Sequence, residues 1–198
     1  MPCPELADAI VSTARKTLEN TIKLIEQNNT WGARVIYGDT DSVFVLLPGR
    51  NRQQAFKIGR EIAKVVSDSN PEPLKLKFEK VYFPCFLQTK KRYCGLAYEN
   101  EEQKIPFFDS KGIETIRRDF CPLASKSLKK CLNVLFETKN VSLVKEKFQH
   151  IFMNVYSGKI KLNDFFQSRI YKGMNFHANT LNPIQELVKY DFAELPTS

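Results

Sequence analysis

The amino-acid sequence predicts an α+β fold in which a strand-rich part is followed by a helical part. Short runs rich in β-branched and aromatic residues lie before residue 118, separated by turn-forming residues. Apolar residues recur at helical spacing near the N-terminus and again after residue 119. We therefore place a domain boundary there, with one part over residues 1–118 and a second over residues 119–198.

The helices follow from periodicity and capping signals. Leu6, Ile10, Leu18 and Ile25 belong to an apolar stripe that predicts a helix from Glu5 to Gln27. Asn51 and Gln54 have the spacing of a capping box and begin a second helix, which Asn70-Pro71 ends. Pro122 suits the first turn of a third helix. Two more helices are predicted over residues 142–156 and 162–167.

The strands are predicted from apolar runs and alternation. Two apolar runs flank the segment Tyr37-Gly38-Asp39-Thr40-Asp41-Ser42, which predicts a β-hairpin with carboxylates at its tip. Residues 74–98 alternate in a strand-like way, interrupted by Pro84.

Asp39 and Asp41 are the strongest candidates for a metal site. Residues two apart on a strand point to the same side, and neighbouring carboxylates repel each other unless a cation neutralises them. Carboxylate oxygens suit Mg²⁺. The alternative is a solvated turn, because Asp favours turn geometry for its own sake.

Basic residues dominate the stretch from Lys75 to Arg92, which holds six of them and one acid. The net charge is +8 and the pI about 9.2, which favours a polyanionic partner such as nucleic acid. The alternative is a solvated edge strand protected by lysines.

The five cysteines form no Cys-x-x-Cys pair, so neither zinc nor an iron–sulfur cluster is expected. Their scatter fits a reducing compartment, cytosol or nucleus. No apolar run approaches the length of a transmembrane helix, so we expect no membrane partner.

Three ordered blocks resemble family B DNA polymerases. Tyr-Gly-Asp-Thr-Asp-Ser at 37–42 is similar to the third palm motif of the family. Residues 90–93 resemble the family's Lys-Lys-Arg-Tyr motif, and residues 111–119 resemble its palm-to-thumb junction. Residues 1–8, 46–49 and 135–139 resemble the zeta type most, and the delta type comes second. The resemblance covers roughly residues 1–171.

This resemblance implies a late palm over residues 1–118 and an early thumb from 119, with a tail from about residue 174 left unassigned. It implies a two-metal site for two Mg²⁺ ions, with Asp41 as direct ligand and Asp39 in a weaker or second role. Tyr37, Gly38 and Ser42 would support the turn, and we expect Gly38 to supply a backbone angle that other residues avoid.

The resemblance also implies duplex-DNA contacts. Lys90, Lys91, Arg92 and Tyr93 would contact phosphates and the minor groove of the primer-template. Lys111, Arg117 and Arg118 would contact the DNA backbone further from the active site. The alternative for these three residues is a charged interdomain hinge.

The implied parent protein is a nuclear DNA-directed DNA polymerase for translesion synthesis, using primer-template DNA, deoxynucleoside triphosphates and accessory subunits. We find neither the earlier palm Asp motif nor the triphosphate-binding helix in these 198 residues. We therefore expect Met1 to be internal to a longer sequence and the segment alone to be inactive. The alternatives are a non-catalytic duplex-binding remnant, a delta-type replicative fragment, and a partner-binding scaffold.

Overall fold

The computed structural model describes residues 3–168 and confirms the α+β class. Within that range the elements are α1 (Pro4–Gln27), β1 (Arg34–Asp39), β2 (Ser42–Leu46), α2 (Arg52–Ser69), β3 (Val81–Thr89), β4 (Arg92–Tyr98), β5 (Phe107–Lys111), α3 (Pro122–Thr138), α4 (Val141–Tyr156) and the 3-10 helix η1 (Leu162–Phe165). The strands form two antiparallel sheets, β1–β2 and β3–β4–β5. The tail beyond residue 174 lies outside the described residues.

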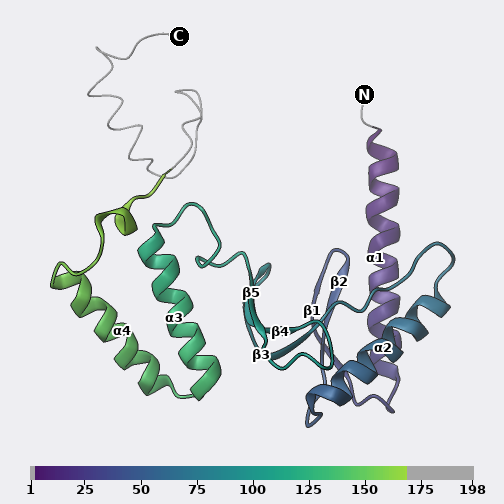
Figure 1. Ribbon diagram of the computed structural model, residues 1–198. Coiled ribbons are helices and arrows are strands. Elements are labelled where there is room, and N and C mark those ends of the chain that lie inside the picture. Colours follow the sequence, from purple (N-terminus) through teal and green to yellow (C-terminus); the bar gives the residue numbers. More distant parts are fainter. Residues whose placement is uncertain (1–2, 169–198) are drawn as a thin grey trace.

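The two sheets lie between two groups of helices. Figure 1 shows α1 and α2 at one end, α3 and α4 at the other, and the strands in the middle. Helix α1 runs well past the strands, so Leu6 and Ile10 near its start are exposed, whereas Ile25 near its end is buried. The apolar stripe of α1 is therefore covered only in its last turns.

Local sequence signals place the helix ends correctly. Asn51 Oδ1 accepts a hydrogen bond from the Gln54 N–H at 2.9 Å, and Gln54 Oε1 accepts one from the Asn51 N–H at 3.0 Å. The predicted capping box is thus confirmed, and such a cap contributes about 1 kcal/mol. Pro122 lies in the first turn of α3, as predicted. The short helix expected over residues 162–167 is a 3-10 turn at Leu162–Phe165.

The expected strand over residues 74–98 is wrong in its first part, because residues 74–80 form no strand. Side chains hold this segment against α2. The Phe78 ring packs on Phe56 with centroids 5.6 Å apart, and the Leu76 N–H donates to Ser67 Oγ at 2.9 Å. Gly59 makes room for the same ring, since a Cβ there would lie 2.3 Å from it. A polar partner on the helix thus replaces a partner strand.

Pro84 lies inside β3 and does not end it. The pairing of β3 with β4 shifts between Tyr82 and Cys85, so the missing N–H of Pro84 falls at an irregularity of the ladder. Strand β5 is an element that the pattern does not predict, because its five residues mix aromatic, acidic and basic types.

Within the described residues, buried apolar side chains form two hydrophobic cores. The first joins Ile25 of α1, Trp31, and Ile62 and Val66 of α2 beneath the β1–β2 hairpin. The second joins Cys94 of β4, Ile113, and Leu132 and Phe136 of α3. The second core crosses residue 119, so the change there is one of secondary structure within a continuous core. The division into two domains stays a prediction.

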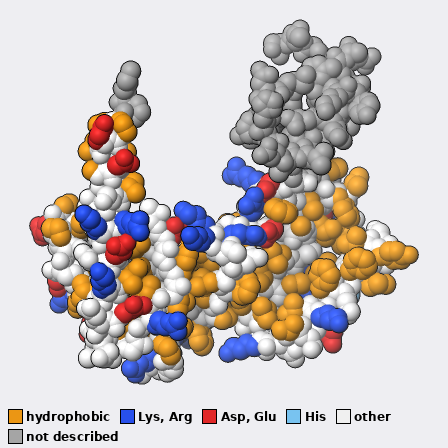
Figure 2. All heavy atoms as spheres, turned by 180° about the vertical axis from the view of Figure 1, so that it is seen from behind, with side chains coloured by type: hydrophobic (Ala, Val, Ile, Leu, Met, Phe, Trp, Pro, Cys, Tyr) orange, Lys and Arg blue, Asp and Glu red, His pale blue; other side chains and the backbone are white. Residues whose placement is uncertain are grey.

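The helical end carries exposed apolar side chains. Figure 2 shows hydrophobic atoms gathered over this end, and Phe148, Phe152, Met153 and Tyr156 of α4 are each more than half exposed. Within residues 3–168, no helix has the length and hydrophobicity needed to cross a membrane.

Gly112 fixes the approach of the segment after β5 to the turn between β3 and β4. Its φ is +65°, and a Cβ on it would lie 2.1 Å from the Lys91 carbonyl oxygen. The position therefore needs glycine both for its left-handed backbone and for lack of space.

We expect Gly112→Ala to lower the free energy of unfolding well beyond the roughly 1 kcal/mol that a left-handed alanine costs. The matched control is Gly158→Ala, because Gly158 has φ +66° and nothing lies within 4 Å of the place that its Cβ would take. Urea unfolding of both variants of the chain checks this. Equal losses of stability in the two variants would contradict it.

Candidate catalytic and DNA-binding site

The acidic tip is a tight β-hairpin. Asp39 is the last residue of β1 and pairs with Ser42, the first residue of β2, so Thr40 and Asp41 form a two-residue turn. The strand alternation expected to align the two carboxylates does not apply to Asp41, because Asp41 lies in the turn. Asp39 is half-buried and Asp41 is exposed.

The carboxylate of Asp39 is already engaged. Its Oδ1 atom accepts from Thr40 N at 3.1 Å and Thr40 Oγ1 at 3.2 Å, and lies 3.2 Å from Lys91 Nζ. Partial desolvation opposes ionisation of Asp39, but Lys91 and Thr40 outweigh it and lower its pKa. Asp39 is therefore negatively charged at neutral pH and held next to a cation.

Asp41 makes no hydrogen bond or ion pair within residues 3–168, so its oxygens face solvent. The two carboxylates supply oxygen donors of the kind that Mg²⁺ prefers. In the described part of the chain no group of three or more His, Cys, Asp or Glu is placed to hold a metal. The tip thus fits a share of a hard-cation site and does not complete one.

Gly38 is one of the residues expected to support the turn. Gly38 does not have the unusual backbone angle expected of it, since its φ is not positive and a Cβ there would meet only ordinary contacts, the nearest at 3.8 Å from Leu18 and Ser42. The expectation is wrong because Gly38 is a regular strand residue facing α1. Left-handed backbone occurs instead at Lys91 in the neighbouring hairpin and at Gly112 after β5, among other described residues.

A second hairpin tip lies directly beside the first. Strands β3 and β4 are joined by the two-residue turn Lys90-Lys91, and the Lys91 N–H donates to the Tyr37 hydroxyl at 2.9 Å. Below the tips, four rings from the two sheets pack together. Phe44 lies 4.8 Å from Tyr93, 5.6 Å from Tyr37 and 5.7 Å from Tyr82, measured between ring centroids.

A polar network closes the far side of this aromatic cluster. Tyr82 Oη donates to Asp109 Oδ2 at 2.6 Å, and Lys80 Nζ lies 2.9 Å from the same oxygen. Burial and the bond to Asp109 raise the pKa of Tyr82. Partial burial opposes ionisation of Asp109, but Tyr82 and Lys80 lower its pKa overall. The ion pair between Lys80 and Asp109 therefore stays intact under the rings at neutral pH.

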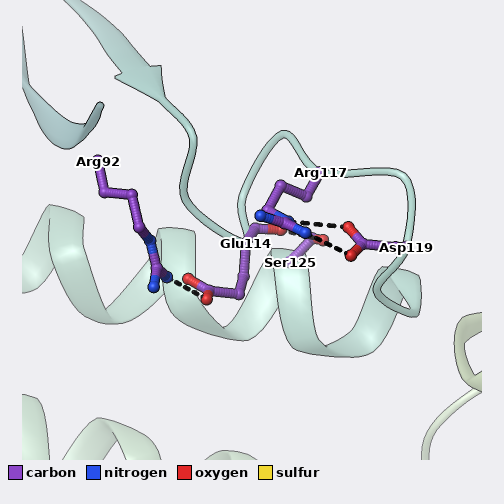
Figure 3. Close-up of polar contacts among 5 residues, drawn as sticks. All are labelled: Arg92, Glu114, Arg117, Asp119 and Ser125. Atoms are coloured by element: carbon purple, nitrogen blue, oxygen red, sulfur yellow. Dashed lines mark hydrogen bonds and ion pairs between the residues drawn. The ribbon is translucent and has the colours of Figure 1, made fainter. Parts of the chain in front are cut away.

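The side chain of Arg92 is partly covered and points toward Glu114. Its guanidinium donates to Glu114, and its Nε is buried without a hydrogen-bond partner in the described residues (Figure 3). A backbone hydrogen bond, followed by the Arg92 guanidinium, lowers the pKa of Glu114. Ser125 Oγ of α3 donates to the Glu114 carbonyl at 2.7 Å. Arg92 and Glu114 thus tie the β3–β4 hairpin to the start of α3.

The other basic candidates separate into two groups. Lys90 and Lys111 are exposed near the tips, Lys111 pairing with Tyr93 across the sheet. Arg117 lies near the end of the junction over residues 111–119 and makes a two-pronged pair with Asp119, at 2.9 and 2.6 Å, while Arg118 is exposed (Figure 3). The structure therefore gathers Lys90, Lys91, Arg92 and Tyr93 around the acidic tip, with Arg117 and Arg118 near α3.

The sequence pattern does not identify the residues that hold the two hairpin tips in position. Glu114 and Gly112 occur inside the junction block, and nothing in their spacing indicates partners in β4. Asp109 and Phe44 likewise contact residues far away in the chain, which no local pattern encodes.

The chain is similar in sequence to known DNA polymerases over most of its length. A sequence profile for DNA polymerase family B matches residues 1–191. The DNA polymerase zeta catalytic subunit of Mus musculus is 53% identical over 190 residues, covering 96% of this chain and 6% of the relative. That of Saccharomyces cerevisiae is 51% identical, covering 83% of this chain and 11% of the relative. The DNA polymerase delta catalytic subunit of Oryza sativa is 40% identical, covering 78% and 15%.

The chain thus spans from 6 to 15% of the length of these relatives. The family profile covers nearly all of it, including both hairpin tips and the junction before α3. The chain belongs to DNA polymerase family B.

Proposed function

We propose that this chain forms part of the synthesis site of a template-directed DNA polymerase, with residues 1–118 as late palm and an early thumb from residue 119, the tail from about residue 174 being left unassigned. The observation that carries the proposal is the pairing of an acidic tip with a basic tip, joined by the 3.2 Å contact between Asp39 and Lys91. Nucleotidyl transfer needs carboxylates where the reacting phosphate meets the primer end, and cations along the duplex next to it.

The acidic tip would contribute oxygen donors for Mg²⁺. Bound Mg²⁺ would activate the primer hydroxyl and stabilise the leaving pyrophosphate. Asp41 is the better direct ligand, because it is exposed and no described residue competes for its oxygens. Asp39 would act mainly through its charge, since Thr40 and Lys91 already occupy Oδ1.

The basic tip would contact the duplex. Lys90 and Lys91 occupy the turn itself, and Tyr93 stands below them in the ring cluster. Lys111, Arg117 and Arg118 would extend the contact along the DNA backbone toward α3. In this arrangement Arg92 supports the tip through Glu114, and its part in DNA binding would be secondary to that support.

Sequence similarity supports a zeta-type enzyme over a delta-type one, with 53% identity to a zeta subunit and 40% to a delta subunit. We propose accordingly that the parent protein carries out translesion synthesis in the nucleus, on primer-template DNA with deoxynucleoside triphosphates, together with accessory subunits.

A chimera tests the catalytic proposal. Residues 3–168 replace the matching segment of the mouse zeta catalytic subunit, and single-turnover nucleotide incorporation is measured. We expect Asp41→Asn to slow incorporation on the order of a hundredfold or more, as loss of a group that stabilises the transition state does. Asp39→Asn should cost about tenfold, the scale of a residue that acts through another ligand.

Both substitutions are nearly isosteric, so duplex affinity, measured in parallel, reports whether the site is intact. The reverse order of effects would exchange the two roles. An active chimera that tolerates both substitutions would show that the hairpin is no metal site. A chimera that binds duplex DNA without synthesis would favour a non-catalytic duplex-binding role for this chain.

Salt dependence tests the basic tip. The 198-residue chain with Lys90→Gln and Lys91→Gln should bind duplex DNA with a salt slope shallower by roughly 1.8, or about 0.9 per lost phosphate contact. The matched control is Lys57→Gln with Lys64→Gln, two lysines of α2 that belong to neither tip. Arg92 is left unchanged because its loss would remove the ion pair with Glu114. Equal slopes in both double variants would assign Lys90 and Lys91 to a solvated turn.

A further inference from the structure

The main chain of Lys91 is fixed from three directions. Its φ of +59° places it in the left-handed region, its N–H donates to the Tyr37 hydroxyl at 2.9 Å, and its carbonyl oxygen fills the space that a Cβ of Gly112 would need. Tyr37 is in turn held by ring contacts with Phe44 and Tyr93. The position of the Lys91 Cα is therefore set by the fold.

The side chain of Lys91 is free by comparison. It is 71% exposed, and its sole ion pair among the described residues is the 3.2 Å contact with Asp39 Oδ1. Ion pairs as exposed as this one contribute little stability, so the ammonium exchanges easily. A fixed main chain with a mobile ammonium restricts Lys91 to positions around the two tips.

Asp39 is a shared acceptor at the centre of those positions. The same carboxylate pairs with Lys91 here and belongs to the tip that would take up a divalent cation. A divalent cation and an ammonium repel each other strongly at such short range. A cation held by Asp41 beside Asp39 would therefore weaken the attraction between Asp39 and the Lys91 ammonium.

We propose that Tyr37 and Gly112 position Lys91 so that its ammonium passes from Asp39 to a phosphate of bound duplex DNA when the acidic tip takes up a divalent cation. The inference rests on the proposed function and adds to it a coupling between cation and duplex binding that runs through one lysine. Coupling of this kind is reciprocal, so bound duplex also raises the affinity of the tip for the cation.

The test begins without divalent cations. A short fluorescent duplex is titrated with the 198-residue chain at fixed ionic strength, and Asp39→Asn releases the ammonium of Lys91. Duplex affinity should rise roughly two- to fivefold, the scale of one exposed ion pair. In the Lys91→Gln background, Asp39→Asn should change the affinity clearly less, so a double-mutant cycle isolates the coupling.

Two matched variants separate this coupling from general charge effects. Asp41→Asn removes the same charge two residues away without touching Lys91, so its effect should be the same with or without Lys91→Gln. Lys90→Gln removes the same charge as Lys91→Gln from the same turn, and it should leave the Asp39→Asn effect in place.

The second arm adds Mg²⁺. Mg²⁺ competes with any basic protein for DNA phosphates, so the informative quantity is the ratio of affinities between variants. The loss of affinity caused by Lys91→Gln should grow roughly two- to fivefold when Mg²⁺ is present, while the loss caused by Lys90→Gln should not change.

Equal effects of Asp39→Asn in the Lys91 and Lys91→Gln backgrounds would overturn the inference, as would equal behaviour of Lys90→Gln and Lys91→Gln. In those cases duplex binding persists and the proposed function stands. A wild-type chain that binds no duplex DNA would overturn both.

Discussion

The contact between the two hairpin tips is the constraint on which the site depends. The two sheets share no strand-to-strand ladder, so backbone hydrogen bonds between strands do not set their relative position. That position comes from the rings of Tyr37, Phe44, Tyr82 and Tyr93 and from the bond of the Lys91 N–H to Tyr37. Aromatic pairs of this kind add a modest free energy each, but together they place acidic and basic groups within 3.2 Å.

The junction before α3 extends the same principle to the helical end. Arg92 begins β4 next to the basic tip, and its guanidinium reaches Glu114, whose carbonyl accepts from Ser125 of α3. The second hydrophobic core runs under this link through Cys94, Ile113 and Leu132. A displacement of α3 would therefore also shift the basic tip, because the ion pair between Arg92 and Glu114 connects them. This geometry explains why the Arg92 side chain is two-thirds covered, while its predicted contact with DNA stays a prediction.

Local features could be predicted from the sequence because their causes are local. Asn51 with Gln54, and Pro122, act on backbone within a few residues, and both mark helix starts correctly. The acidic hairpin follows from two apolar runs around a turn. The family follows from three ordered motifs, which the profile over residues 1–191 confirms.

Contacts between distant segments could not be predicted in this way. The partners Lys91 and Tyr37 are 54 positions apart, and Arg92 and Glu114 are 22 apart, with no periodic signal joining them. The same reason explains why the left-handed glycine is expected at the wrong position. A sharp turn suggests a left-handed Gly38, but the demand for glycine arises at Gly112, where the Lys91 carbonyl of another hairpin comes close.

Hydrogen exchange at the Lys91 amide tests most directly whether the two tips are joined. In the wild-type chain this amide should be protected although it lies in an exposed turn, because it donates to the Tyr37 hydroxyl. Tyr37→Phe keeps the ring in its cluster and removes only the acceptor, so exchange should speed up roughly fivefold, as expected for a hydrogen bond of about 1 kcal/mol. Tyr98→Phe, at the other end of β4, should leave the rate unchanged. A Lys91 amide that exchanges equally fast in all three proteins would contradict the account.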